Sequence, residues 1–238
     1  MAETVVAGPD DQGMARLSPD GSWILYWEWP KSERAPGAAP TWSRQLMRVP
    51  VSGGASDLVL ESAWIPNGNM GFRCAHASGA PAPCVLAEER DNQVVFSAFD
   101  PVGGRRGVIT TIQVIGPGIG WDLSPDGSRI AVTDYDERGG RLRIIALPGG
   151  PLRELWMKRW VRVSYPAWTS DGTALFVVGS SVSGEALLHV DLQGVTTILR
   201  ESQGIYALFY MPAPSPDGRS LMFSETTTHS NAWLLEDF

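Results

Sequence analysis

Short apolar runs, each preceded by a tight polar turn, recur along the whole chain. The turn reads Ser-Pro-Asp-Gly at 18–21, 124–127 and 215–218, and Thr-Ser-Asp-Gly at 169–172. The runs that follow these turns are rich in β-branched and aromatic residues: SWILYWEW, SRIAVTDY, TALFVVGS and RSLMFSET. They are nearly continuous in apolar residues rather than alternating, which is typical of strands covered on both faces.

The residues of the turn explain why the chain reverses there. Pro19 presets φ for the first turn position, and the carboxylate of Asp20 can accept hydrogen bonds from backbone N–H groups. Gly21 supplies the positive φ that closes a hairpin. The sequence therefore predicts an antiparallel strand pair around each copy of the turn.

Two more strands are predicted in each repeat. Third strands read RQLMRVPVSGG, QVVFSAFDPVGG, RLRIIALPGG, EALLHVDLQG and SNAWLLEDF; fourth strands read SDLVLES, GVITTIQV, PLRELWM and GVTTILRE. Each repeat is thus a strand, a turn, two strands, a glycine turn and a last strand. No segment shows a sustained apolar period of 3.6 residues, so we expect almost no helix.

The spacing of the turns identifies the architecture. A weaker copy, Ile-Pro-Asn-Gly at 65–68, serves as the marker of the second repeat, and the five Asp or Asn markers are 47, 59, 45 and 46 residues apart. Blades of β-propellers have four strands and need roughly 40–50 residues. We assign the surplus of the 59-residue gap to a Gly/Ala/Pro-rich loop insertion at 71–84. The prediction is an all-β fold, a β-propeller of about five four-stranded blades.

The blades are expected to form one domain over residues 1–238. Their predicted ranges are 14–60, 61–114, 119–157, 164–201 and 206–238, the last completed by a strand at 4–7. Such a strand would close the ring and remove two exposed sheet edges. The alternative is that the chain is a fragment of a larger propeller.

Composition narrows the class of protein. Hydrophobic residues make up 43% of the 238 residues, enough for a sizeable core, and no apolar run is long enough to insert into a membrane. The formal net charge of -7 disfavours nucleic acid as a partner. No signal peptide is visible, so we expect a cytoplasmic protein, or a periplasmic one if the chain belongs to a longer exported or anchored protein. The oligomeric state is left open.

The repeats resemble the WD40-like PD40 repeat of TolB-type β-propellers, over residues 14–238. The segments FRCAHASGAPAPCVLAEE, QVVFSAFDP and SNAWLLEDF are also similar to C-terminal propellers of large bacterial regulatory proteins. In those proteins the propeller follows a serine/threonine kinase or a winged-helix domain. The resemblance implies a sensor or interaction module, and it carries over no catalytic residue.

Signals for catalysis or metal binding are weak. The string GSSVSG at 179–184 lacks the second glycine of a nucleophile elbow at the right place, and DYDERGG at 134–140 has Arg138 where a calcium loop needs a ligand. His76 near Cys74 and Cys84 is a poor zinc set. We therefore expect no enzyme, no cofactor and no metal site. Eight basic residues against four acidic ones at 129–162 are interpreted as solvated positions on outer strands rather than as an anion-binding patch.

Cys74 and Cys84 flank a Pro-containing loop. In an oxidising compartment they would form a disulfide, and in a reducing one they would be small buried thiols.

Aromatic residues near the first strands are the best candidates for binding. Trp121, Asp122, Tyr165 and Tyr210 lie in segments that we interpret as loops entering these strands, where they would surround the mouth of a central channel. The alternative is that the aromatic rings pack between blades. The predicted function is a non-catalytic binding module for a protein or small-molecule ligand at the channel face, with the sensory part of a bacterial regulatory system as one role. The alternative function is an accessory or gating propeller of a peptidase or hydrolase system.

Overall fold

The computed structural model describes residues 10–29, 43–63, 71–76, 84–90, 93–113, 120–202 and 207–227. All regular elements in these ranges are β-strands, which form five antiparallel sheets. Within them no helix is long and apolar enough to span a bilayer. The all-β prediction is confirmed.

The first four sheets each contain four strands that pair in chain order, as the repeats predict. Blade 1 consists of β1 (Asp11–Leu17), β2 (Trp23–Trp29), β3 (Ser43–Pro50) and β4 (Asp57–Ala63). Blade 2 consists of β5 (Phe72–Cys74), β6 (Cys84–Arg90), β7 (Gln93–Asp100) and β8 (Gly104–Gln113). Blade 3 consists of β9 (Gly120–Leu123), β10 (Arg129–Asp136), β11 (Gly139–Ala146) and β12 (Leu152–Met157). Blade 4 consists of β13 (Arg162–Trp168), β14 (Ala174–Ser181), β15 (Gly184–Asp191) and β16 (Thr196–Glu201).

The fifth sheet has two described strands, β17 (Ala207–Pro214) and β18 (Leu221–Thr227). The described part of the chain therefore contains four complete blades, one fewer than the predicted number of about five. The predicted closing strand at 4–7 and the predicted third strand SNAWLLEDF lie outside the described residues. Closure of the ring stays a prediction.

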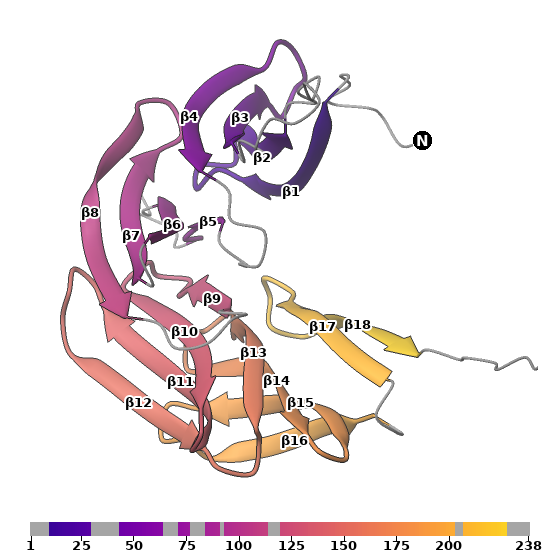
Figure 1. Ribbon diagram of the computed structural model, residues 1–238. Coiled ribbons are helices and arrows are strands. Elements are labelled where there is room, and N and C mark those ends of the chain that lie inside the picture. Colours follow the sequence, from indigo (N-terminus) through magenta and orange to yellow (C-terminus); the bar gives the residue numbers. More distant parts are fainter. Residues whose placement is uncertain are drawn as a thin grey trace, which may run out of the picture.

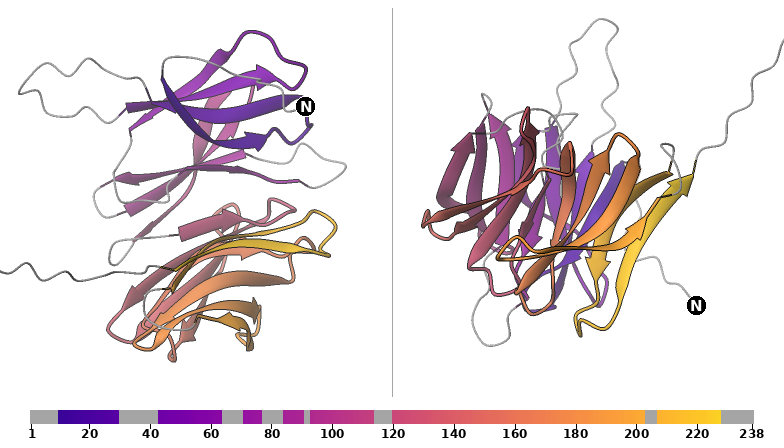
Figure 2. Two further views of the ribbon diagram at one scale, coloured as in Figure 1. Left: turned by 90° about the vertical axis from the view of Figure 1, so that its right-hand side faces the viewer. Right: turned by 90° about the horizontal axis from the view of Figure 1, so that it is seen from below.

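The sheets are arranged as blades around an axis (Figure 1). The first strand of each blade lies on the inner side of the arc, and the fourth strands β4, β8, β12 and β16 lie on the outer side. The views in Figure 2 show the sheets following one another side by side. This arrangement covers both faces of the middle strands, which explains why their sequences are apolar without alternation.

The hydrophobic core is divided into three clusters, each shared by two neighbouring blades. Blades 1 and 2 meet where Trp27 packs edge-on against Phe72, with ring centroids 5.8 Å apart. Blades 2 and 3 meet where Phe96 packs edge-on against Trp121 at 5.2 Å. Blades 3 and 4 share a third cluster that includes Trp168. Burial between blades, rather than within one, thus holds the array together.

The polar turns have the predicted geometry in the four copies that the structure describes. In the first turn, the backbone N–H of Gly21 donates to the carbonyl of Ser18, and Gly21 has a φ of 71°. The hydroxyl of Ser18 donates to Asp20 and accepts from the N–H of Trp23 at 3.0 Å. The same contacts recur at the turns that begin with Ser124, Thr169 and Ser215.

Blade 2 differs from the prediction in its first hairpin. Residues 72–74 form the first strand and not part of a loop insertion, so the hairpin loop runs through 75–83 and the Ile-Pro-Asn-Gly segment precedes this strand. The interpretation of Asn67 as the turn marker is wrong, because this blade has no Ser-x-Asp-Gly turn to align.

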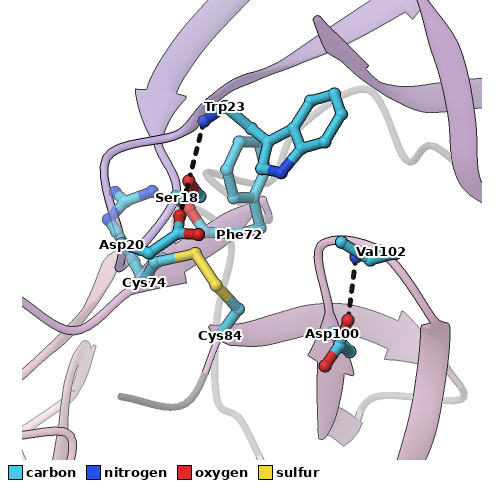
Figure 3. The surroundings of a disulfide bond; sticks show 9 residues. Ser18, Asp20, Trp23, Phe72, Cys74, Cys84, Asp100 and Val102 are labelled. Atoms are coloured by element: carbon cyan, nitrogen blue, oxygen red, sulfur yellow. Dashed lines mark hydrogen bonds between the residues drawn. A yellow bond between two sulfur atoms is a disulfide. The ribbon is translucent and has the colours of Figure 1, made fainter. Parts of the chain in front are cut away.

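A disulfide joins Cys74 and Cys84 at the base of this different hairpin (Figure 3). The two residues are direct partners across β5 and β6, at the position where Leu123 pairs with Ile130 in blade 3. Both cysteines are buried in the cluster shared by blades 1 and 2, close to the first turn with Ser18 and Asp20. The covalent bond therefore closes the hairpin at the place where the other blades have a hydrogen-bonded polar turn.

Candidate ligand-binding site

The first strands of the blades place a set of equivalent residues next to the axis. Next to the hairpin, the first two strands of each blade pair in the same register, so the residue two positions before the turn, or before the hairpin loop in blade 2, can be compared from blade to blade. In chain order, this residue is Arg16, Arg73, Asp122, Ala167 and Ala213. The first three are charged and lie on adjacent strands, and we call them the inner-strand charge cluster.

Asp122 is the centre of this cluster. Its Oδ1 accepts a hydrogen bond from Nε of Arg73 on β5 at 3.1 Å, and its Oδ2 accepts one from the backbone N–H of Trp168 on β13 at 3.0 Å. The carboxylate thus connects blades 2, 3 and 4. The side chains of Asp122 and Arg73 are 20% and 22% exposed, so water screens this ion pair only partly.

The cluster perturbs the acidity of its members. Burial raises the pKa of Asp122, and it does so against the charge of Arg73 and the hydrogen bonds from the backbone of Trp168 and Leu123. Neighbouring protein atoms exclude part of the water around the Arg16 guanidinium and lower its pKa, although the residue is exposed overall; the nearby charge of Arg73 lowers the pKa further, while that of Asp122 raises it. The three charged groups therefore interact electrostatically across three blades.

A second repeated feature lies two residues earlier on the same strands. Met14, Tyr165 and Met211 have left-handed φ values of 57°, 51° and 49°, and each lies where the register between first and second strand shifts. A positive φ is uncommon for residues other than glycine. The equivalent residues of blades 2 and 3 are Gly71 and Gly120. The first strands of blades 1, 4 and 5 thus have a bulge that changes the direction of the backbone beside the axis, whereas β5 and β9 pair without a register shift.

Gly120 allows blades 3 and 4 to approach closely at this level. A Cβ atom on Gly120 would lie 2.7 Å from Cδ of Pro166 and 3.0 Å from the backbone nitrogen of Tyr165. Any larger residue would push β13 away from β9. The close approach brings the backbone of Tyr165 next to the start of the strand that carries Trp121 and Asp122.

The four residues singled out from the sequence all lie within first strands, not in loops that enter them. Trp121 and Asp122 are in β9, Tyr165 is in β13 and Tyr210 is in β17. Trp121 is 1% exposed and packs between blades, Asp122 is the centre of the charge cluster, and Tyr165 is half-buried. For Tyr210 only the backbone is described, opposite Ser224. The structure thus places Asp122 against the backbone of Trp168 and Gly120 against the backbone of Tyr165, and it places the Trp121 side chain in the core.

Arg16 and Arg73 are the members of the site that sequence reasoning missed. Arg16 lies two residues before the first Ser-Pro-Asp-Gly turn, and Asp122 lies two residues before the second. An alignment of the turns would therefore have placed Arg16 and Asp122 at equivalent positions. Arg73 had no such signal, because the hairpin of blade 2 lacks the turn.

The basic stretch at 129–162 makes internal ion pairs. Arg141 and Arg143, with side chains 8% and 6% exposed, both donate to the buried carboxylate of Asp134 at 2.6–2.8 Å. The interpretation of these two arginines as solvated is therefore wrong, because their charges are neutralised inside blade 3. Arg138 on the hairpin tip forms an ion pair with Asp136 at 2.8 Å.

The fold and the site together define a β-propeller whose first strands carry a charged cluster beside the axis. TolB from Acinetobacter baumannii superimposes with a TM-score of 0.65 at 16% identity over 92% of this chain, which spans 50% of the TolB chain. A putative TolB from Agrobacterium tumefaciens gives 0.66 at 17% identity, covering 94% of this chain and 73% of that one. The chain thus has the TolB-type propeller fold that its repeats predict.

A propeller enzyme is also among the similar structures. A puromycin hydrolase matches with a TM-score of 0.52 at 18% identity, over 90% of this chain and 33% of the hydrolase. No family model matches the sequence, and none of the curated proteins matches it. At such low identities the similarity is one of fold.

Proposed function

We propose that this protein is a non-catalytic binding module that presents the inner-strand charge cluster to a protein or small-molecule ligand. The observation that carries the proposal is the placement of Arg16, Arg73 and Asp122 at one equivalent position of three adjacent blades. Charged side chains beside the axis of a rigid array suit recognition, because the scaffold fixes their geometry before the ligand arrives.

The surroundings of the serines and histidines favour binding over hydrolysis. The nucleophilic serine of a Ser-His-Asp hydrolase donates its hydroxyl proton to a histidine. The hydroxyl of Ser180, in the GSSVSG segment, donates to Glu185 at 2.8 Å, and that of Ser181 donates to the carbonyl of Gly184. The ring of His189 lies against Phe176 with centroids 5.5 Å apart. These contacts support a structural role for the segment.

The sequence resemblance to propellers of bacterial regulatory proteins supports a sensory role for the module. In this role, ligand binding beside the axis would be reported to another domain or protein. The second candidate is an accessory or gating propeller of a peptidase or hydrolase system. The similarity to puromycin hydrolase favours it, because this chain corresponds to a third of that enzyme.

The test is affinity capture from bacterial cytosol and envelope extracts on the immobilised chain. We expect a partner that is retained by the wild type, lost with Arg16→Glu and weakened with Tyr165→Ala. Arg153→Glu is the matched control, because Arg153 is exposed on the outer strand β12. An identical set of captured proteins with all four chains would contradict binding at the inner strands. Capture of a hydrolase, with an altered rate of peptide cleavage on addition of this chain, would favour the second candidate.

A further inference from the structure

The inner-strand charge cluster has more positive than negative charge. Arg16 and Arg73 occupy equivalent positions on the adjacent strands β1 and β5, and Asp122 is the single carboxylate at that level of the described first strands. One unit of positive charge thus remains without a counter-charge in the cluster. Two neighbouring guanidinium groups repel each other unless an anion lies between them.

The acceptor atoms of Asp122 are already used. Arg73 donates to Oδ1, and the backbone of Trp168 donates to Oδ2. Arg73 also donates from Nη1 to the carbonyl of Phe72 at 2.9 Å. The hydrogen bond recorded for the Arg16 guanidinium runs to the carbonyl of the neighbouring Ala15 at 3.0 Å. Arg16 is exposed, so most of its donors are available to a ligand.

Further unpaired N–H donors lie close to Arg73. The Nε1 atoms of Trp27 and Trp121 are buried and lack a hydrogen-bond partner within the described residues. A Cβ on Gly71 would lie 3.7 Å from Nε1 of Trp27 and 4.0 Å from Nη1 of Arg73. The guanidinium of Arg73 lies 5.4 Å from the ring centroid of Trp121. The region is therefore rich in donors and poor in acceptors, and buried donors without acceptors are unfavourable.

We propose that Arg16 and Arg73 bind an oxyanionic group of the ligand, a carboxylate or a phosphate, beside the axis at the level of Gly71. A guanidinium group presents its donors as a planar fork that matches two oxygens of such a group. The anion supplies the missing negative charge and accepts the hydrogen bonds that the Arg16 guanidinium can donate. Asp122 stays paired with Arg73 and Trp168. It therefore reduces the net positive charge of the site but does not occupy the hydrogen-bond donors of Arg16. This inference rests on the proposed function, because it names the ligand chemistry of the same site.

The experiment is a titration of the intact chain with sodium phosphate and, separately, with sodium citrate at constant ionic strength and neutral pH. Binding is followed by isothermal titration calorimetry and by tryptophan fluorescence, because Trp27 and Trp121 lie beside the site. We expect saturable binding of at least one anion to the wild type and to Arg153→Gln. In Arg16→Gln the dissociation constant should rise about tenfold or more. The dissociation constant of Arg16→Lys should lie between those of the wild type and Arg16→Gln, because lysine keeps the positive charge but loses the planar pair of donors.

The outcomes separate this inference from the proposed function. Equal affinity of Arg16→Gln and wild type, or no saturable binding by the wild type, would overturn the oxyanion site. If a protein partner is still captured in an Arg16-dependent way, the binding module stands without this ligand chemistry. Tighter binding of citrate would identify a carboxylate ligand, and tighter binding of phosphate a phosphorylated one. Melting curves of each variant ensure that unfolded protein is not scored as loss of binding.

Discussion

Asp122 accepts a hydrogen bond from Nε of Arg73 at 3.1 Å, and this contact joins the first strands of two neighbouring blades. The same carboxylate accepts the backbone N–H of Trp168 in the next blade. A single acidic side chain therefore connects three blades beside the axis. Its position makes it both part of the scaffold and part of the candidate site, and the predictions below separate these two contributions.

Replacing Asp122 by alanine should destabilise the fold. The change leaves the Arg73 guanidinium and the N–H of Trp168 without their acceptor, which costs about 2–3 kcal/mol in the free energy of unfolding. Urea unfolding at neutral pH measures this. In a double-mutant cycle with Arg73→Met, the two losses should be less than additive because the residues share one interaction. Strict additivity would show that the ion pair contributes nothing.

Stability should fall in acid because of the turn carboxylates. Burial opposes ionisation of Asp126, but hydrogen bonds from Ser124 and Ser128 and the charge of Arg129 outweigh it and lower the pKa from 3.8 to about 2. Because the folded-state pKa lies below the usual value, this stabilisation is fully present above about pH 4 and is lost as the pH falls towards 2. Asp126→Asn should therefore flatten the decline of the unfolding free energy between pH 5 and pH 2. Unchanged slopes in the variant would contradict this account.

The disulfide should stabilise blade 2. Cys74 and Cys84 are 10 residues apart, and closing a loop of that size contributes about 2–3 kcal/mol in the chain-entropy model. The double variant Cys74→Ala/Cys84→Ala should melt at a lower temperature than the oxidised wild type. Reduction of the wild type by dithiothreitol should lower its melting temperature, and the reagent should leave the double variant unaffected.

Trp121→Ala should lower the free energy of unfolding, because the Trp121 side chain is part of the core rather than of the binding surface. The side chain is buried and packs edge-on against Phe96, so its removal leaves a large cavity between blades 2 and 3. Losses of about 3–5 kcal/mol are typical for such changes. Trp121→Phe, which keeps an aromatic ring, should lose less. A variant that unfolds at the wild-type urea concentration would contradict the buried position of this ring.

Gly120→Ala should separate the first strands of blades 3 and 4. The added Cβ meets Pro166 and the backbone of Tyr165 at 3.0 Å or less, and relief needs movement of β13. We expect a loss of about 1–3 kcal/mol. Gly107→Ala is the matched control, because a Cβ on Gly107 of β8 would meet nothing within 4 Å. Equal stability of the two variants would show that the strands yield easily at Gly120.

Sequence alone determined the repeated hairpin and the class of fold. The Ser/Thr-x-Asp-Gly turn is a local device, in which Ser18, Asp20 and Gly21 satisfy one another and the adjacent backbone. A local device can be read from a local pattern. The apolar runs after each turn indicated strands covered on both faces, and the near-constant spacing indicated blades. The first hairpin of blade 2 could not be recognised from this pattern, because Cys74 and Cys84 close it in place of the turn.

Only the tertiary structure decided which side chains face the axis and which are buried. Trp121 and Asp122 are adjacent in sequence, yet alternate side chains of a strand point to opposite faces, so Trp121 packs against Phe96 of blade 2 while Asp122 reaches the backbone of Trp168 in blade 4. Arg16, Arg73 and Asp122 come from three blades, and their charges meet because the register of each strand pair and the packing between blades bring them to one level. Such a cluster depends on contacts between residues about 50 positions apart, which no local pattern along the chain encodes.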